Sequence, residues 1–298
     1  MKPADLVIIF VNFRSGELLK RKVSERLEEG FTVRIVDNSG EYAGHGEVLR
    51  SNRNLGFGAG CNVALRTLDE ATRVVCFCNP DVDVQADDLL KLARSLSSQP
   101  RPGLVAPALM IDGQLRARGF HYPSLAREVA LALRSTAEIS EGRVPSASRR
   151  LASRGRRFGT AALLAASVPA LRAVGGFDER YFLYAEDLDL WHRVKARGFS
   201  TTFIPSSRAY HARGGGSPAT APQREVLRWV GVELFQFLHG GSWRAMRVVH
   251  RRAIHRLAGD AAILVKAVSG LWDAGKPPDE VAVQLRPLLE SGAWLESR

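Results

Sequence analysis

Apolar runs alternate with helical patterns along the first part of the chain, and this alternation restricts the fold more than any other feature. Residues 6–11 (LVIIFV) are apolar at every position, which predicts a strand buried on both faces. Further strands are expected at 32–40, 48–50, 73–84 and 103–110, with helices at 16–30 and 87–96 and within 51–68. This order predicts an α/β fold with a mostly parallel sheet sandwiched by helices.

Polar residues follow the apolar runs at the expected carboxyl ends of the strands. Asn12, Asp37, Asn52 and Asp81 all occupy such positions. Because ligands of open α/β sheets bind outside these strand ends, the four positions predict a binding site at one edge of the sheet.

Charge and cysteine content narrow the classes of partner. The chain has 298 residues and a formal net charge of +11, which favours anionic partners such as nucleotide phosphates or an anionic membrane. The sequence contains no helix-turn-helix pattern and no basic motif interleaved with aromatic residues, so nucleic acid is not an expected partner. Cys61, Cys76 and Cys78 have no metal-binding spacing and are expected to be buried, reduced thiols.

No run approaches 18 apolar residues, and the first residues lack the pattern of a signal peptide. We therefore expect a cytoplasmic protein, or one attached to the inner face of the cell membrane.

Two motifs near the predicted strand ends suit a phosphate-bearing ligand. The loop LGFGAG at 55–60 follows the third strand, whereas a dinucleotide fingerprint would follow the first. Its glycines are better explained as allowing the backbone and a helix N-terminus to approach a ligand closely. The segment NPDVDV at 79–84 places oxygen ligands at alternate positions, as Mg²⁺ or Mn²⁺ bound with substrate phosphates requires. An acidic turn without metal remains the alternative.

Acidic residues also lie among aromatic ones in GGFDERYFLYAEDLDLWHRV, residues 175–194. Its apolar neighbours favour burial, so we expect carboxylates on the wall of a partly dry site, with a raised pKa that suits a general base. Acids that complement a helix N-terminus are the alternative interpretation.

Taken together, the motifs resemble family 2 glycosyltransferases, which are inverting enzymes of the GT-A fold. The resemblance covers about residues 5–215 and rests on the order VDNSG, NLGFGAGCN, NPDVDV, GGFDERYFLYAEDLDLWHR and YHARGGGS. The pattern of the last three is most similar to the rhamnosyltransferase-like branch. The resemblance therefore implies hexosyl transfer from a nucleotide-diphosphate sugar, dTDP- or UDP-linked, to a glycan or lipid-linked acceptor in cell-surface polysaccharide synthesis.

The resemblance also assigns roles by position. It places the nucleotide base at Asp37 and assigns further nucleotide-sugar contacts to Asn12, Asn54, Gly56, Asn62 and Asn79. Asn79 stands where many relatives have an acid, which leaves the metal ligation open.

The same resemblance assigns the chemistry to the acids and the late histidine. Asp187 matches the catalytic base, with Glu186 as the second choice. The divalent metal, Mg²⁺ or Mn²⁺, is assigned to Asp81, Asp83 and His211. Aromatic residues of the 175–194 segment, among them Phe177 and Trp191, are expected to shape the acceptor side.

Residues 1–215 are expected to form the catalytic domain and 216–298 a C-terminal helical extension. Within 134–157 the arginine-rich composition predicts a loop, either a solvated linker or a flap that touches an anionic ligand. Residues 224–257 predict two amphipathic helices, the second with an arginine-rich face. We expect its apolar stripe to pack on the catalytic domain, and the basic face is compatible with membrane contact.

Other functions are compatible with parts of the sequence. A degenerate sugar-nucleotide-binding scaffold without activity has the same fold, but Asp81, Asp187 and His211 are all present. A nucleotidyltransferase would carry a glycine-rich loop with a basic residue directly after the first strand, which VNFRSGE at 11–17 fits poorly.

Overall fold

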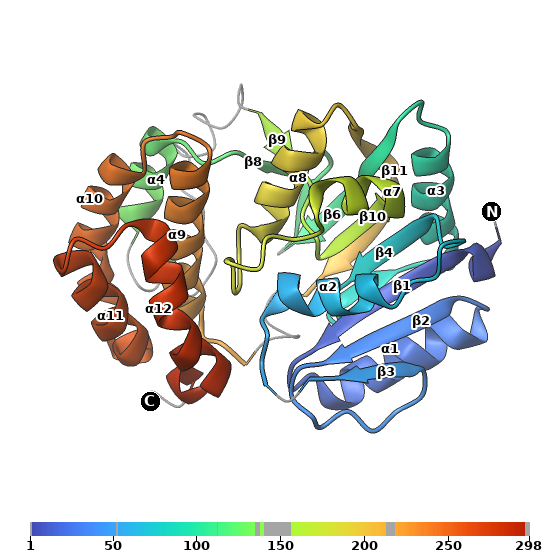
Figure 1. Cartoon of the computed structure of the whole chain (residues 1–298), viewed down its shortest axis with the longest axis horizontal. Coiled ribbons are helices and arrows are strands. Elements are labelled where there is room, and N and C mark those ends of the chain that lie inside the picture. Colours follow the sequence, from blue (N-terminus) through green and yellow to red (C-terminus); the bar gives the residue numbers. More distant parts are fainter. Residues whose placement is uncertain are drawn as a thin grey trace. The chain divides into compact units, whose positions relative to one another are not determined.

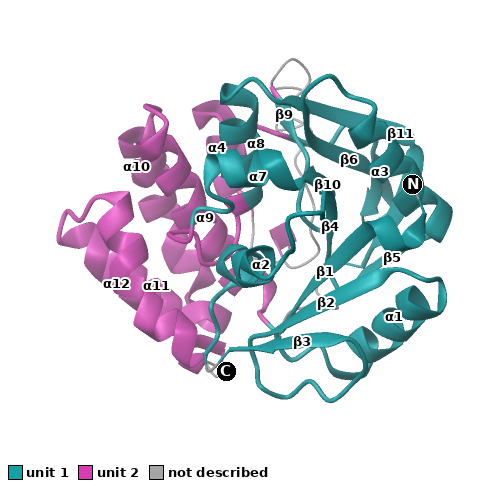
Figure 2. Ribbon diagram, turned by 45° about the vertical axis from the view of Figure 1, so that its right-hand side comes forward, with its two compact units in different colours: residues 1–120, 157–178, 187–218 teal, residues 121–156, 179–186, 219–298 magenta. Residues whose placement is uncertain are grey.

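The computed structural model describes residues 2–51, 53–111, 113–134, 138–139, 156–212 and 218–295. Asn52 and most of the basic segment 134–157, for which predictions were made, lie outside these residues. The described chain forms two compact units (Figure 2). Unit 1 comprises 1–120, 157–178 and 187–218, and unit 2 comprises 121–156, 179–186 and 219–298.

Unit 1 is built on a mixed sheet in which β1 to β4 are parallel. The strand order is β3-β2-β1-β4-β10-β6-β11-β5, with β7 added beside β6, and β10 runs antiparallel to both of its neighbours. The strands of this sheet are β1 (Leu6–Asn12), β2 (Thr32–Asp37), β3 (Glu47–Arg50), β4 (Val74–Cys78), β5 (Val82–Val84), β6 (Pro102–Ile111), β7 (Gln114–Arg116), β10 (Leu163–Ser167) and β11 (Ser200–His211). Strands β8 (Phe120–His121) and β9 (Arg157–Phe158) form a separate two-stranded sheet.

Helices cover both faces of this sheet, as the uninterrupted apolar strands predict (Figure 1). On β1, Leu6, Ile8 and Phe10 pack in the core under α1 and α3, while Val7 and Ile9 pack in the core under α2, α7 and α8. The helices of unit 1 are η1 (Pro3–Asp5), α1 (Gly16–Glu28), α2 (Phe57–Arg66), α3 (Ala86–Ser97), α7 (Val168–Val174) and α8 (Glu186–Ala196).

The cysteines belong to the two cores of unit 1. Cys76 and Cys78 alternate with Val75 and Phe77 along β4, so both thiols enter the α1/α3 core, and Cys61 enters the other. All three are free and buried, as expected. Burial raises the pKa of the Cys78 thiol to about 12, so it is an apolar core residue rather than a nucleophile.

Unit 2 is helical and has its own apolar core. Trp229, Leu264, Trp272 and Leu285 are among the buried residues of this core. Among the described residues, no helix combines the length and apolarity that crossing a membrane requires. Its helices are α4 (Leu125–Ala132), α9 (Ala221–Leu238), α10 (Trp243–Ala253), η2 (Ile254–Leu257), α11 (Ala258–Asp273), α12 (Pro278–Ser291) and η3 (Ala293–Leu295).

A buried ionic network ties α4 to α9 and α10. Arg228 Nη2 donates to Glu128 Oε2 at 2.9 Å and to Glu225 Oε1 at 2.8 Å, and His250 Nδ1 lies 2.8 Å from Glu233 Oε1. Burial alone would raise the pKa of Glu128, but the charge of Arg228 and the hydrogen bond with His250 hold it well below its usual value. A charge left in this interior without its partner would be costly, so the network holds α4 in place.

The division of the chain differs from the predicted one at 215. Residues 219–298 form helices of unit 2, but segments 121–156 and 179–186 also belong to this unit. The reason is visible in α4, whose Glu128 pairs with Arg228, a residue 100 positions later. A single boundary read along the sequence does not anticipate such distant pairing.

Candidate functional site

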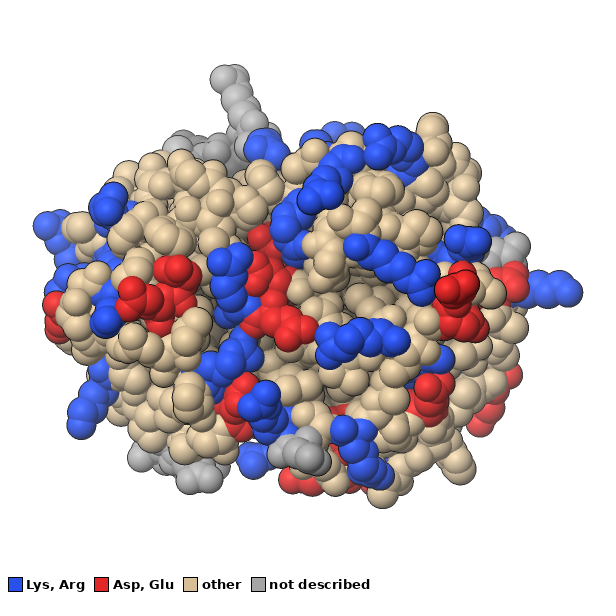
Figure 3. Space-filling model, viewed as in Figure 1, with Lys and Arg blue, Asp and Glu red and all other residues tan. Residues whose placement is uncertain are grey.

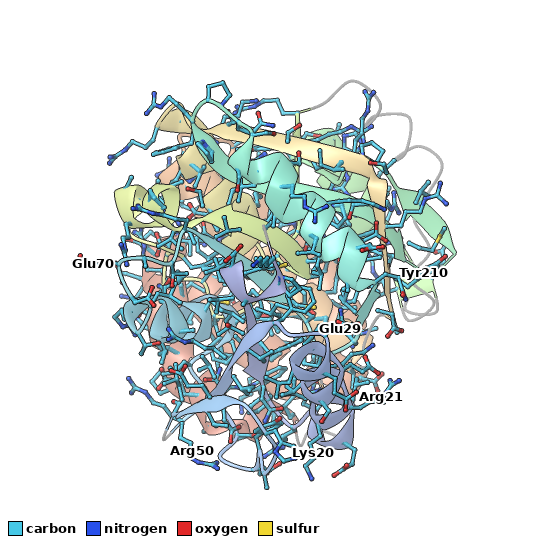
Figure 4. All side chains as sticks on the ribbon, turned by 90° about the vertical axis from the view of Figure 1, so that its right-hand side faces the viewer. Lys20, Arg21, Glu29, Arg50, Glu70 and Tyr210 are labelled. Carbon is cyan, nitrogen blue, oxygen red and sulfur yellow. The ribbon has the colours of Figure 1, made fainter. Side chains whose placement is uncertain are left out.

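Asn12 and Asp37 meet at the carboxyl ends of neighbouring parallel strands, as their positions predict. They are opposite each other in the register of β1 and β2, and Asn12 Nδ2 donates to Asp37 Oδ1 at 2.8 Å. The Asp37 carboxylate also accepts from the Tyr42 N–H at 2.9 Å and from Arg50 Nη1 at 3.2 Å, the latter from edge strand β3 (Figure 4). Ser39 contributes its N–H and its hydroxyl. Asp37 therefore fixes the loop that follows β2.

The environment of Asp37 favours its charged form. Its side chain is fully buried, and burial alone would raise its pKa. The donors outweigh this effect, led by the Tyr42 N–H and the Asn12 amide, and hold the pKa of Asp37 below its usual value. The carboxylate is ionised at neutral pH and is already surrounded by donors, so a base contact at this position stays a prediction.

The glycine-rich loop is fastened to the same strand end through Asn38. Its backbone N–H donates to Asn12 O at 2.9 Å, and its Nδ2 donates to Gly56 O at 2.9 Å. Asn54 Oδ1 accepts from the Gly56 N–H at 3.1 Å. Gly56 has a φ of +82° directly before α2, a conformation that favours glycine. The structure thus brings Asn12, Asn54 and Gly56 together.

Asn62 has a holding role that sequence reasoning did not anticipate. On α2, its Nδ2 donates to Phe177 O at 2.9 Å, and its Oδ1 accepts from the Phe177 N–H at 2.9 Å. A Cβ on Gly176 would lie 2.4 Å from that Oδ1, so glycine is required for this approach. The amide fastens the start of the FDE segment to α2, and its predicted contact with the nucleotide is not tested.

Asp81 and His211, two of the three residues assigned to a metal, lie side by side. His211 Nε2, at the end of β11, is 3.2 Å from Asp81 Oδ1, and the Ala212 N–H donates to Asp81 O at 3.1 Å. Asp81 lies in the loop between β4 and β5, close after Asn79. One carboxylate and one imidazole therefore face each other at the end of the sheet.

Asp83 is not part of this pair. Its side chain is 64% exposed and forms an ion pair with Lys22 of α1. On β5 it lies opposite Tyr210 of β11, whose exposed side chain is labelled in Figure 4. A metal at Asp81 and His211 would therefore take Asp83 as a ligand only after the Lys22 pair had opened.

The donor set at Asp81 and His211 fits a divalent cation that also binds substrate phosphates. Carboxylate oxygen is a suitable ligand for Mn²⁺, and imidazole nitrogen is a common ligand of metal ions in proteins. Cations of this kind commonly take one or two protein carboxylates and complete their shell with phosphate and water. The structure has no group of three or more His, Cys, Asp or Glu side chains placed to hold a metal, in the residues it describes.

Asp187 is held at the start of α8 by the segment between β9 and β10. Its Oδ2 accepts from the Ala161 N–H at 3.2 Å, its Oδ1 accepts from the Leu188 N–H at 2.8 Å, and the Thr160 hydroxyl also bonds to it. Burial raises the pKa of Asp187, and these donors oppose the rise without cancelling it. A raised pKa is the direction of shift expected of a general base in a partly dry site.

The turn before Asp187 is strained. Tyr184 and Ala185 have φ values of 71° and 69°, in a region that costs a side-chain-bearing residue about 1–3 kcal/mol each. The turn packs closely against Gly231 of α9, where a Cβ would lie 2.4 Å from Tyr184 O. Glu186, the next residue, is buried. The local conformation of the acid pair is therefore set by a turn that only close packing can maintain.

Some aromatic residues of the 175–194 segment are core residues, which corrects the prediction that they shape an acceptor site. Phe177 is 2% exposed and meets Phe77 edge-to-face, with ring centroids 5.1 Å apart. Trp191 is 1% exposed and stacks on Phe203 at 5.1 Å. Phe177 therefore fixes the segment before α8 against β4, and Trp191 fixes α8 against β11.

The residues that the sequence did not reveal share one property: each holds one of the predicted site residues in place by a hydrogen bond. Arg50, Tyr42 and Ser39 hold Asp37, and Thr160 and Ala161 hold Asp187. Only the placement of Ser39 inside the VDNSG motif gave a signal for any of them.

Relatives of known activity exist, although no family model matches the chain. N-acetylglucosaminyl-diphospho-decaprenol L-rhamnosyltransferase of Mycobacterium tuberculosis (strain CDC 1551 / Oshkosh) is 26% identical over 271 residues, which cover 80% of this chain and 87% of the relative. The same enzyme of strain ATCC 25618 / H37Rv matches to the same extent.

Among solved structures, a mannosyltransferase from Pyrobaculum calidifontis, in complex with GDP-Man and Mn²⁺, has a TM-score of 0.53 at 16% identity. The match covers 97% of this chain and 81% of that one. The structural match confirms the predicted fold class, and the sequence match confirms the predicted resemblance to family 2 glycosyltransferases.

Proposed function

We propose that this chain, a glycosyltransferase of the GT-A fold, moves a sugar from a nucleotide-diphosphate donor to a hydroxyl of a lipid-linked glycan, with inversion at the anomeric carbon. The observation that carries the proposal is the joint presence in unit 1 of Asp187, with its raised pKa, and the Asp81–His211 pair. The relative from M. tuberculosis is named for L-rhamnose and a decaprenol-linked acceptor. We therefore propose rhamnose as the sugar and cell-surface polysaccharide synthesis as the process.

Asp187 is the proposed base, with Glu186 as the second choice. Its carboxylate removes a proton from the acceptor hydroxyl as that oxygen attacks the anomeric carbon on the face opposite the diphosphate. A single displacement of this kind inverts the stereochemistry and needs no covalent intermediate. Activity should therefore be lost as the pH falls through the raised pKa of Asp187, because the protonated form cannot accept the proton.

The nucleotide-diphosphate donor, dTDP- or UDP-linked, is proposed to bind at the loops after β1 and β2 and before α2. The order that Asp37 and Asn38 impose on these loops prepares the site before the ligand arrives. Asn12, Asn54, Gly56, Asn62 and Asn79 are the proposed nucleotide-sugar residues. Asp81 and His211 would hold Mg²⁺ or Mn²⁺, which would offset the negative charge developing on the leaving diphosphate.

Donor binding should stabilise the chain in a metal-dependent way. In a thermal-shift screen of dTDP, UDP, GDP and their sugars with and without Mn²⁺, one nucleotide at about 100 times its Kd should raise the Tm by roughly 4–5 °C. Asp81→Ala should remove the Mn²⁺-dependent part of the shift, because the carboxylate beside His211 is lost.

Asp83→Ala is the matched control, since Asp83 pairs with Lys22 and lies opposite Tyr210, not His211, in the register of β5 and β11. It should leave the Mn²⁺-dependent shift unchanged. Equal loss in both variants would contradict the assignment of the metal to Asp81 and His211, and a shift that EDTA does not alter would remove the metal from the proposal.

A lipid-linked acceptor requires the chain to work at a membrane, and unit 2 has a surface suited to that. Leu125 and Val129 of α4 and its C-cap residue Leu133 are 37%, 38% and 73% exposed at a spacing of four residues. Helix α10 packs against α4 and exposes Val248 (50%) together with Arg244 and Arg252. We propose that these six residues form one surface, the apolar-basic face.

The charges around this face favour an anionic lipid surface as its partner. Residues 234–259 contain no Asp or Glu. In the space-filling view, acidic and basic side chains both occur across the visible surface (Figure 3). Each arginine near an anionic bilayer contributes about 1 kcal/mol of binding, and the exposed apolar side chains add to it. We propose peripheral attachment to the inner face of the cell membrane through this face.

Vesicle sedimentation tests the attachment. The wild-type chain should bind phosphatidylglycerol vesicles and not phosphatidylcholine vesicles, and 0.5 M salt should release it. Val248→Glu should reduce binding by about tenfold, because it places an acid in the apolar-basic face. Val283→Glu is the control, since Val283 is 61% exposed on α12 outside this face. Equal effects of the two variants would contradict the assignment of the face.

A further inference from the structure

We infer that Thr160 is a positioning residue for the proposed base, and that it acts by donating its hydroxyl hydrogen bond to the Asp187 carboxylate. Neither the motifs of the sequence nor the resemblance assigns a role to this threonine. Its consequence for turnover rests on the proposed function, whereas its effect on Asp187 does not.

The hydrogen bonds around Thr160 fix the direction of the donation. The Ala162 N–H donates to Thr160 Oγ1 at 3.3 Å, so one lone pair of the hydroxyl oxygen is used by the backbone. The hydroxyl has a single proton, and an ionised carboxylate can only accept. The proton of Thr160 therefore points to Asp187, beside the Ala161 N–H that reaches Oδ2 at 3.2 Å.

The same short segment also touches the strand end that carries the proposed donor site. Ala162 O accepts from the Asn79 N–H at 2.8 Å, and Leu163 is paired with Cys78 in β10 and β4. Asn79 begins the NPDVDV motif that contains Asp81. Residues 160–162 therefore connect the carboxylate that would take the proton with the loop that would bind the diphosphate.

Close packing keeps this segment in place. A Cβ on Gly159 would lie 2.5 Å from Ala106 Cβ and 2.6 Å from a ring carbon of Trp191, so the chain passes directly over β6 and α8. Trp191 itself is buried on the same helix as Asp187. The backbone before Thr160 is thus held against the helix that carries the base. Its hydroxyl can therefore orient the Asp187 carboxylate.

A donor aimed at the carboxylate favours its ionised form and orients its lone pairs. Burial raises the pKa of Asp187, and the Thr160 hydroxyl is the first of the groups that limit this rise. Without the hydroxyl, the carboxylate should hold its proton to higher pH and should rotate more freely. Both effects reduce the fraction of enzyme that is ready to accept a proton at neutral pH.

The test compares three variants by pH profile. Thr160→Val removes the hydroxyl at nearly constant shape and should move the acid limb of kcat/KM to higher pH, with kcat about tenfold lower at neutral pH and the KM for donor unchanged. Thr160→Ser keeps the hydroxyl and should restore the profile. Thr72→Val is the control, because Thr72 makes the same kind of bond to Asp69, in the loop between α2 and β4.

A titration of the Asp187 carboxyl carbon by ¹³C NMR measures the same effect without turnover. Its pKa should be higher in Thr160→Val than in the wild type and in Thr160→Ser. An unchanged pKa together with an unchanged pH profile would overturn the inference, and so would equal losses in the valine and serine variants. Absence of transfer by the wild-type chain would contradict the proposed function instead, and the NMR titration would still decide the role of Thr160.

Discussion

Replacing Asp187 by asparagine should lower kcat by about 10²–10⁴-fold while nucleotide binding persists, because this range is what a positioned general base contributes. Asparagine has nearly the same shape, and its carbonyl oxygen can still accept the Ala161 N–H that Asp187 accepts at 3.2 Å. The change therefore removes the proton acceptor and keeps the Ala161 contact, while the amide nitrogen takes the place of the oxygen that accepts the Leu188 N–H. Single-turnover kinetics with saturating donor would measure the loss at the chemical step.

Glu186→Gln is the control for this prediction, since Glu186 is adjacent and is the second choice as base. Near-normal turnover in Asp187→Asn combined with a large loss in Glu186→Gln would move the role to Glu186. The pH profile gives an independent check. Wild-type kcat/KM should fall at low pH with an apparent pKa above the usual range of an aspartate, because burial raises the pKa of Asp187.

Replacing Gly231 by alanine should destabilise the chain by about 1–3 kcal/mol, although alanine normally improves a helix interior by about 1 kcal/mol. The new Cβ would lie 2.4 Å from Tyr184 O and 3.1 Å from Ala185 Cβ. These are the two residues whose left-handed backbone precedes the acid pair. The variant should therefore lose both stability, measured by urea unfolding, and turnover, since the turn aims Glu186 and Asp187.

Gly270→Ala provides the comparison, because Gly270 also lies inside a helix, α11, and a Cβ there would meet nothing within 4 Å. This variant should gain about 0.5–1 kcal/mol and keep full turnover. If Gly231→Ala proved as stable and as active as Gly270→Ala, the strained turn would not depend on its packing against α9.

The sheet could be predicted because its signals are local. A run such as LVIIFV is short and rich in β-branched residues, which indicates a strand buried on both faces, and the structure places alternate residues in the two cores. The meeting of Asn12 with Asp37 followed from the same reasoning, because parallel strands end at one edge. The pairing of Asp81 with His211 needed the resemblance, since nothing local joins residues 130 positions apart.

The remaining features depend on contacts that no local pattern encodes. Asp83 alternates with Asp81 in the sequence as a second ligand would, yet Lys22 of α1 pairs with it. The inclusion of α4 in unit 2 follows from Glu128 and its pairing with Arg228. The left-handed backbone at Tyr184 and Ala185 is an unfavourable local choice that packing maintains, so propensity gives no warning of it.

The central claim is that this chain transfers a sugar from a nucleotide diphosphate with inversion. We would incubate the purified chain with Mn²⁺, a polyprenyl-diphosphate-linked N-acetylglucosamine acceptor and each of dTDP-rhamnose, UDP-sugars and GDP-sugars, and analyse the product by mass spectrometry and NMR. The account predicts addition of one sugar, from one donor class, with the anomeric configuration opposite to that of the donor. Retained configuration would contradict the single displacement at Asp187, and nucleotide binding without transfer to any acceptor would favour a non-catalytic scaffold of the same fold.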